Sequence, residues 1–451
     1  MNTTSASSPE WEQLPRVNLH AAGLDIGSAE IWAAVPPDDD PQPVRSFGTY
    51  TPDLLALADW LQHCHIETVA MESTGVYWIP IFEILEARGV QVLVVNARHL
   101  KHVPGRKSDI QDCQWIQRLH SFGLLTGSFR PEAEIVVLRA YLRQRATLIE
   151  DRAAHIQHMQ KALFQMNVQL PQVVTDITGK TGQAIIHAIL AGERNPQVLA
   201  QLRDERCAKS ADEIARALTG NYRPEHVFAL KQAVAVYDFY TTQIQECDTE
   251  IEQQFSALKP ERAEALPPLD RSAKRNTHSK NGPSYDARDL LYQMTGVDLV
   301  AISGLNASTV QTILSEVGTS LSAFASEKQF SAWLGLAPHN AISGGKVLRS
   351  HVLKTGNRAG QAFRLAAQSV SRKRDGYGAY YRRQCARLGP QKAIVATAHK
   401  LARVFYHVLK EHTPFQTLSA EDYDRQVRKR ELANLKKKAA KLGFALIETP
   451  A

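Results

Sequence analysis

The N-terminal part of the chain alternates apolar runs with polar turns, as in an α/β domain. Three apolar runs predict strands: residues 21–35, 67–73 and 90–96. Helical periodicity predicts a helix over residues 76–89, between the last two strands, and another helix that starts at Asp109. This order of elements predicts an α/β sheet domain over residues 19–130, preceded by a flexible tail at residues 1–18.

Two long segments follow in which apolar residues recur every three or four positions. They span about residues 135–168 and 226–258. This heptad-like pattern predicts coiled-coil helices, either an antiparallel stalk or a coil shared between subunits, with a helical insertion, over residues 131–258. Three charged residues fall on the apolar seams: Arg145, Arg152 and Asp248. They either weaken the coiled-coil prediction or set the register of the helices.

The rest of the chain divides by composition. Residues 259–291 are polar, proline-rich and without periodicity, which predicts a linker. A mainly α-helical C-terminal domain is predicted over residues 292–415, and a basic helical tail over residues 416–451. Residues 177–193 and 302–318 share a glycine turn before an amphipathic helix, a pattern similar to a helix-hairpin-helix. Such a turn either presents backbone N–H groups to a phosphate or only joins two packed helices.

Charge is concentrated in the C-terminal domain. The chain has a net charge of +7, but residues 341–410 alone contain 15 Lys and Arg against one acid, Asp375. Such a block indicates a polyanionic partner or a strongly solvated surface.

Other features of composition exclude some classes of protein. No apolar run reaches the roughly 18 residues that a membrane helix needs, and residues 1–13 lack a secretory pattern, so we expect a soluble, cytoplasmic protein. The five cysteines are scattered, without a CxxC pair, which argues against a disulfide framework and a zinc ribbon. The 16 histidines form no HExxH motif, which argues against a zinc enzyme.

Four carboxylates stand at conspicuous positions. Asp25 interrupts an apolar strand, where an acid is costly unless it faces a cleft or a ligand. Glu72 marks the carboxyl end of another strand, where α/β sheets place their ligands. Asp109 and Asp112 share one face of the following helix. Each acid alone has an ordinary explanation: a turn cap for Asp25, a surface ion pair for Glu72, and helix initiation for Asp109.

Together the four acids form the order of an RNase H-like nuclease core. Several carboxylates that converge without a cation would repel one another. Carboxylate oxygens suit Mg²⁺, and two such ions could hold the attacking and leaving oxygens of a phosphoryl transfer. The sequence therefore predicts a magnesium site made by Asp25, Glu72, Asp109 and Asp112.

The motifs around these acids carry a family resemblance. GLDIGS, AMESTG and GRKSDIQD resemble the D-E-D-D motifs of the RuvC-like domain in transposases of the insertion-sequence one-ten family, which includes the Piv/MooV-type DNA invertases. ISGLNASTVQTILSEVG and FSAWLGLAPHNAISGGKVLRSHVLKTGN resemble the second transposase domain of that family. The resemblance covers most of residues 20–130 and 295–410, and residues 171–290 receive no role from it.

The resemblance implies a mechanism. The RuvC-like carboxylates would bind magnesium, and Ser343 would attack DNA to form a transient phosphoserine linkage. Gly344 and Gly345 would let backbone and phosphate approach closely. Lys346 and Arg349 could stabilise the charge that develops on the phosphorus. No residue of the sequence identifies itself as the base that activates Ser343.

The resemblance also implies a structured guide RNA that pairs with donor and target DNA. The residues expected to contact nucleic acid are Lys346, Arg349, Lys354, Arg358, Arg364, Arg372, Lys373 and Arg374. Tyr377, Tyr380 and Tyr381 lie among the basic residues, either as stacking platforms or as core residues. Nothing in the residues themselves distinguishes RNA from DNA as the basic partner.

The sequence thus predicts a DNA transposase or recombinase of an insertion sequence, acting as a dimer or tetramer. Two alternatives keep the four carboxylates: a site-specific DNA invertase, and a Holliday-junction endonuclease of the RuvC type that uses water in place of Ser343. A third is a domesticated, non-catalytic nucleic-acid-binding protein.

Overall fold

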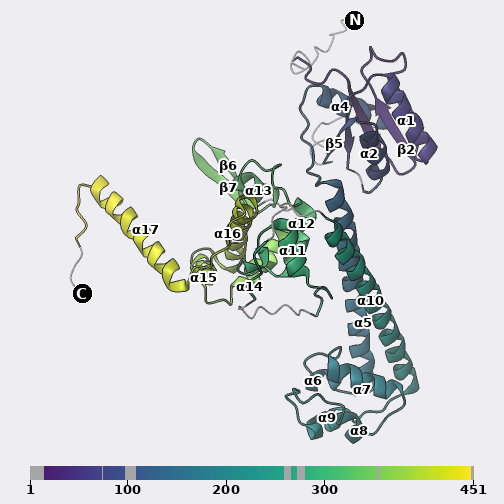
Figure 1. Ribbon diagram of the computed structural model, residues 1–451, viewed down its shortest axis with the longest axis vertical. Helices are drawn as coiled ribbons and strands as arrows, with labels where there is room; N and C mark the ends of the chain where they lie inside the picture. The colour runs from purple at the N-terminus through teal and green to yellow at the C-terminus, as the bar shows by residue number, and fades with distance from the viewer. Residues whose placement is uncertain are drawn as a thin grey trace, which may run out of the picture. The chain divides into compact units, whose positions relative to one another are not determined.

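The computed structural model divides the chain into two compact units, residues 1–130 and 131–451 (Figure 1). It describes residues 15–73, 75–96, 108–258, 266–271, 280–352 and 356–447. Most of the predicted tail at residues 1–18 lies outside these ranges. None of the helices within them is long and apolar enough to span a membrane.

The first unit is built on a mixed five-stranded sheet with the order β3-β2-β1-β4-β5. The strands are β1 (Ala21–Ile26), β2 (Glu30–Ala34), β3 (Val44–Gly48), β4 (Thr68–Glu72) and β5 (Gln91–Val95). β1 is parallel to β4, and β4 to β5, whereas β2 runs antiparallel to both β1 and β3. This order is that of an RNase H-like fold, so the predicted fold class is confirmed.

Helices cover both faces of this sheet. They are α1 (Thr51–His63), α2 (Trp78–Ala87) and α4 (Asp109–Ser121). Alternate residues of β1, among them Leu24 and Ile26, share a core with α1 and α2. The other face of β1 packs against α4. β3 and α1 lie outside the elements that the sequence predicted, although α1 buries Leu54, Leu57 and Leu61 with ordinary helical spacing.

The second unit begins with a pair of long helices, α5 (Ala133–Gln165) and α10 (Pro224–Ala257), which pack along each other. Arg145 contacts Asp248 and Arg152 contacts Thr241, so the two helices run antiparallel. The intervening residues form four short helices: α6 (Leu170–Val173), α7 (Lys180–Leu190), α8 (Pro196–Ala200) and α9 (Ala211–Ala217). These helices share an apolar core with the facing parts of α5 and α10. We call residues 166–223, which contain the four short helices, the head.

The remainder of the second unit is mainly helical, as predicted. Its elements are α11 (Ala287–Thr295), η2 (Leu299–Ala301), α12 (Ala307–Val317), α13 (Glu327–Trp333), β6 (Pro338–Ser343), β7 (Lys346–Val352), α14 (Arg358–Val370), α15 (Gly376–Leu388), α16 (Pro390–Glu411) and α17 (Ala420–Lys441). Phe330, Phe363 and Phe405 are fully buried and contact one another through their rings.

The segment predicted as a linker, residues 259–291, is structured at its end. The carbonyls of Asn281 and Gly282 accept hydrogen bonds from Arg145, and α11 starts at Ala287 with Asp286 as its N-cap. Asp286, one of the polar residues that suggested a linker here, is instead the cap of a helix.

Candidate active site

Asp25 and Glu72 come together through the pairing of β1 with β4. These parallel strands pair Leu24 with Met71, and Asp25 and Glu72 are the next residue along each strand. Residues paired across neighbouring strands project to the same face of a sheet. Both carboxylates therefore lie at the carboxyl end of the strands, on one face.

That face is the one that α4 covers. On β1, the Gln117 side chain donates a hydrogen bond to the carbonyl of Ala21 at 3.1 Å. On β4, Thr68 Oγ1 lies 2.9 Å from His120 Nε2. Since Thr68 and Glu72 are four residues apart on one strand, they share this face.

The helix α4 runs antiparallel to β1 and brings its own two acids toward Asp25. Its last turns lie beside Ala21, so its first turn, with Asp109 and Asp112, lies toward the opposite end of the strand. Ser108 caps the helix by accepting a hydrogen bond from the Gln111 N–H at 3.4 Å. Acids in a first turn are also favoured by the helix dipole.

Gly23 allows this close packing. A Cβ atom at residue 23 would lie 2.2 Å from the Gln117 nitrogen and 2.4 Å from the Cys113 carbonyl oxygen. Sequence reasoning overlooked Gly23, although a glycine within a strand is a signal of close backbone approach.

The charges of the four acids act on one another. Burial and the neighbouring Asp109, Asp112 and Glu72 raise the pKa of Asp25 to about 6. The Cys113 thiol lies on the same side, and its pKa rises to about 12, mainly through burial and partly through Asp25. The other three acids singled out in the sequence therefore lie close enough to Asp25 for their charges to act on it.

The chemistry of these four side chains suits a divalent cation. The donors are all carboxylate oxygens, the ligands that Mg²⁺ prefers, and their mutual repulsion is what a cation relieves. As they stand, the described residues do not contain a group of three or more His, Cys, Asp or Glu side chains already closed around an ion position. Residues 97–107, which lead into α4 and include part of GRKSDIQD, lie outside the described residues.

Ser343 belongs to the second unit, where β6 and β7 form an antiparallel hairpin. Ser343 pairs with Lys346 at its tip, and Gly344 and Gly345 between them have φ of 54° and 76°. Two successive residues with positive φ make a two-residue hairpin turn that favours glycine. Ser343 is exposed, as are Lys346 and Arg349. The Gly-Gly pair is a hairpin signal that the prediction of a helical domain did not use.

Comparison with known protein families agrees with both parts of this description. Residues 22–168 match a DEDD transposase domain of the IS110 type, and residues 298–382 match the transposase IS116/IS110/IS902 family, together more than half of the chain. The chain belongs to the IS110 family of transposases. The IS110-family transposase is accordingly a DNA-binding enzyme of phosphoryl transfer, and DEDD transposases typically use a divalent metal. No curated protein matches its sequence.

The basic residues expected at the nucleic acid of this transposase fall into different settings. Arg358, Arg372 and Arg374 are exposed near the ends of α14, as is Lys373. Arg364 is half-buried, its pKa is lowered by burial, and its guanidinium donates to the Gly335 carbonyl at 2.8 Å, a contact that ties α14 to the end of α13. Lys354 lies outside the described residues.

The tyrosines of the transposase are mostly part of its packing. Tyr377 is buried against Phe415, with ring centroids 5.9 Å apart, and Tyr380 contacts Tyr423. Neither ring stands free as a stacking platform. Tyr381 is half-exposed.

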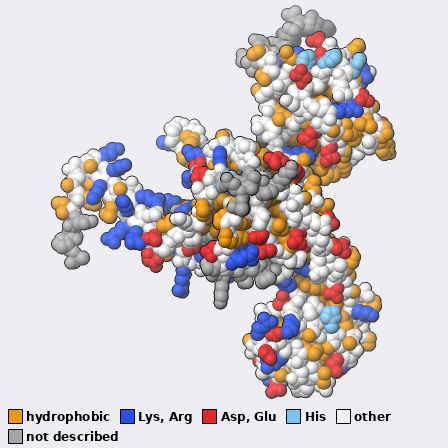
Figure 2. All heavy atoms as spheres, viewed as in Figure 1, with side chains coloured by type: hydrophobic (Ala, Val, Ile, Leu, Met, Phe, Trp, Pro, Cys, Tyr) orange, Lys and Arg blue, Asp and Glu red, His pale blue; other side chains and the backbone are white. Residues whose placement is uncertain are grey.

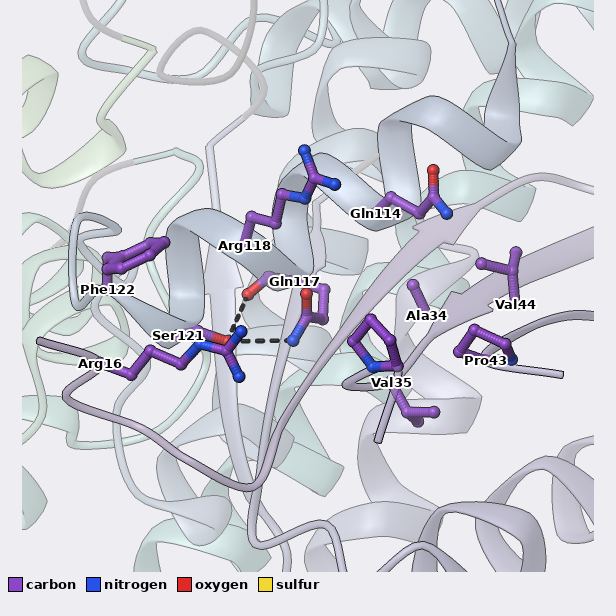
Figure 3. A pocket seen from close by; sticks show the side chains of 11 residues that line it. Arg16, Ala34, Val35, Pro43, Val44, Gln114, Gln117, Arg118, Ser121 and Phe122 are labelled. Carbon is purple, nitrogen blue, oxygen red and sulfur yellow. Dashed lines mark hydrogen bonds between the residues drawn. The ribbon is translucent and has the colours of Figure 1, made fainter. Parts of the chain in front are cut away.

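A separate pocket of about 270 Å³ lies between α4 and the strands β2 and β3 (Figure 3). Arg16, Gln117 and Arg118 are among its lining residues, and Gln117 and Ser121 are hydrogen-bonded to each other there. None of the four acids lines it. Since Arg118 and Ser121 lie at the far end of α4 from Asp109, this pocket is distinct from the carboxylate cluster.

Proposed function

We propose that this transposase excises and inserts a mobile DNA element with magnesium held by Asp25, Glu72, Asp109 and Asp112, and with Ser343 as the nucleophile. The observation that carries the proposal is the pairing of β1 with β4, which sets Asp25 beside Glu72 at the strand ends, on the face that α4 covers with Asp109 and Asp112 in its first turn. Burial and the charges of these acids raise the pKa of Asp25 to about 6. A fold that stabilised only itself would not gather four like charges beside one strand end.

The carboxylates have a defined task in this scheme. Two magnesium ions, when bound, would supply positive charge to the scissile phosphate and to the attacking and leaving oxygens. Asp25 and Glu72, on the paired strands β1 and β4, would supply half of the donor set. The first turn of α4 supplies the other half, with Asp109 exposed and Asp112 half-buried.

The serine step conserves the number of phosphodiester bonds. The Ser343 Oγ forms a bond to the phosphorus, and the bond from phosphorus to one deoxyribose oxygen breaks. The electron pair stays on that deoxyribose oxygen, which takes up a proton, while the serine proton passes to a base or water. Attack by a deoxyribose hydroxyl on the phosphoserine reverses these changes and joins a new strand, so no energy-rich cofactor is required.

The hairpin suits Ser343 to this step. The exposed Gly344 and Gly345 have no atom within 4 Å of where a Cβ would stand, which leaves the tip accessible to a phosphate. Lys346 is the cross-strand partner of Ser343, and its ammonium can approach the negative charge that grows on the phosphoryl oxygens.

We further propose that a structured RNA guides the reaction and that two or four subunits cooperate, because strand exchange joins two duplexes. The support is the basic block of residues 341–410 and the family resemblance. Inversion in place of transposition would use the same chemistry at differently oriented ends.

Trapping a covalent protein–DNA adduct tests the nucleophile. Full-length protein, Mg²⁺ and DNA carrying the element's ends should yield an adduct whose peptide, located by mass spectrometry, contains Ser343. Ser343→Ala should abolish adduct and strand cleavage while retaining DNA binding. Ser350→Ala, on the same hairpin, is the matched control and should retain both.

Cleavage by Ser343→Ala without any adduct would instead support the Holliday-junction endonuclease alternative, in which water attacks. Asp25→Asn should abolish cleavage in either case. Full recombination by Asp25→Asn would refute the carboxylate assignment itself.

A further inference from the structure

The contacts that anchor helix α17 to its domain lie in the first half of the helix. Tyr423 is its one buried residue, and its ring meets that of Tyr380 edge-on with centroids 6.3 Å apart. The Lys400 ammonium lies 4.3 Å from the Tyr380 centroid and 5.0 Å from that of Tyr423. Such cation–π contacts favour the docked position.

Two further contacts complete the anchor. The Gly376 N–H donates to the Leu418 carbonyl at 2.9 Å, just before the helix begins. Arg383 on α15 pairs with Glu431. Beyond Glu431 none of the described residues 432–447 is buried. The last ten residues of the helix therefore extend roughly 15 Å past their anchor.

The helix is strongly basic beyond its first turn. Residues 425–441 hold eight Lys and Arg and a single acid, Glu431, which Arg383 already pairs. The last third carries Lys436, Lys437, Lys438 and Lys441 with no acid among them. Lys and Arg side chains gather over α17 and over the adjoining α15 (Figure 2).

Positive charge also accumulates around the anchor. Burial and the nearby Arg430 lower the pKa of Lys400. Arg382 and Arg387 on α15 are exposed. Like charges held this close are destabilising unless a polyanion compensates them.

The arrangement of the charges excludes two other partners. A second copy of α17 would bring eight further cations against these. A membrane-surface helix needs one apolar face, whereas the consecutive Lys436, Lys437 and Lys438 are about 100° apart and occupy most of the circumference. The apolar Leu435, 51% exposed, lies between basic residues and not on a separate face.

We propose that α17 is a DNA-binding arm that lies along the backbone of duplex DNA in the major groove, contacting phosphates through its lysines and arginines. This inference rests on the proposed function for its partner class. An isolated helix about 10–12 Å across matches the width of the B-DNA major groove, while the deep, narrow major groove of A-form RNA does not admit it. The contacts are sequence-independent, because they go to phosphates.

The test measures binding alone. Full-length Ser343→Ala protein in EDTA is titrated with a duplex of unrelated sequence at several salt concentrations. The slope of log K against log salt is negative. Each phosphate that the protein no longer neutralises reduces the magnitude of this slope by about 0.9. The variant K436Q/K437Q/K438Q/K441Q should therefore show a slope smaller by up to about 3.6 and an affinity about tenfold or more weaker near 0.1 M salt.

Two control variants separate location from net charge and from folding. R203Q/R206Q/K209Q/R223Q removes the same charge from exposed positions in or beside the head, where Asp204, Glu213 and Glu225 pair with three of the residues. It should bind like the parent. K436R/K437R/K438R/K441R keeps the charge and should retain both slope and affinity.

Equal binding by the α17 variant and the head variant would overturn the proposal. So would a larger decrease in affinity for an RNA hairpin than for the duplex, or a decrease confined to anionic phospholipid vesicles. Because neither magnesium nor Ser343 enters this assay, failure of the proposed chemistry leaves its outcome unchanged. A parent protein that binds no duplex at all would overturn both proposals.

Discussion

Arg145 on α5 and Asp248 on α10 form a buried ion pair with two contacts, Nε to Oδ1 at 2.6 Å and Nη2 to Oδ2 at 3.3 Å. The same guanidinium donates to the carbonyls of Asn281 and Gly282, and the Ser284 N–H donates to Asp248. One ion pair thus fixes the register of the two long helices and holds the chain that enters the C-terminal domain.

Arg145→Ala should destabilise the second unit by about 3–5 kcal/mol, because it leaves the carboxylate of Asp248, 2% exposed, without its cation. Denaturant unfolding monitored by circular dichroism measures the change in the free energy of unfolding. Arg223→Ala is the matched control, since it breaks an exposed pair with Glu225 and should change the free energy of unfolding far less. Similar decreases in the two variants would contradict a structural role for the buried pair.

Gly23→Ala should destabilise the first unit by more than about 2 kcal/mol and abolish strand cleavage. The new Cβ would meet backbone atoms of Cys113 and Gln117, so α4 must move, and Asp109 and Asp112 with it. The measurements are thermal unfolding and cleavage of a labelled duplex. Gly89→Ala, where φ is +77° but space is open, should cost only about 1 kcal/mol and leave cleavage intact. Full cleavage by Gly23→Ala would show that the position of α4 does not matter.

Magnesium should stabilise the first unit through the acids around Asp25. A free magnesium concentration of ten times Kd should add about 1.4 kcal/mol to the free energy of unfolding. Asp25→Asn should remove this response and, without metal, raise the melting temperature, because it relieves repulsion by Glu72, Asp109 and Asp112. Glu86→Gln, which changes an exposed acid on α2, should behave like the parent. A magnesium response that survives Asp25→Asn would place the ion elsewhere.

His120 should make the first unit less stable in mild acid. Burial lowers its pKa below 6.5, so the unfolded chain takes up a proton first as the pH falls through about 6.5. The unfolding free energy contributed by His120 is therefore present above pH 6.5 and declines below it, by at most about 1.4 kcal/mol per pH unit.

The raised pKa of Asp25 acts in the opposite sense, since its destabilising charge is lost as the pH falls through about 6. The informative quantity is therefore the difference between the parent and His120→Gln, which keeps a polar group near Thr68. The unfolding free energy of the parent minus that of His120→Gln should therefore decrease between pH 7 and pH 5. A constant difference would mean that His120 is not the group that titrates.

That the other three acids lie within electrostatic reach of Asp25 was largely predictable from the sequence. Asp25 and Glu72 each stand at the end of an apolar run, and parallel strands bring such ends to one edge. The start of α4 at Asp109 also agrees with the prediction. Local sequence patterns could not predict which face of the sheet α4 covers. That depends on the contact of Gly23 with Cys113 and Gln117, about 90 residues away in sequence.

Other features depend on contacts that no local pattern encodes. Arg145 and Asp248 allowed two interpretations until their pairing across 103 residues was known. The basic tail was predicted as a helix from composition, but its anchor requires Tyr423 to meet Tyr380 and Lys400. The hairpin around Ser343 was missed for a different reason: both of its strands are exposed, so burial imposes little alternation on them.

The exposure of that hairpin affects how precisely Ser343 can be positioned. A two-stranded ribbon that water reaches from both sides has little rigidity of its own, and Ile342, Val347 and Leu348 remain 56–71% exposed along it. If Ser343 cuts DNA, the position of its hydroxyl relative to the phosphate depends on the surface that covers those apolar side chains. If the proposed association of subunits supplies that surface, a single copy of the enzyme would hold Ser343 loosely and would cleave DNA poorly.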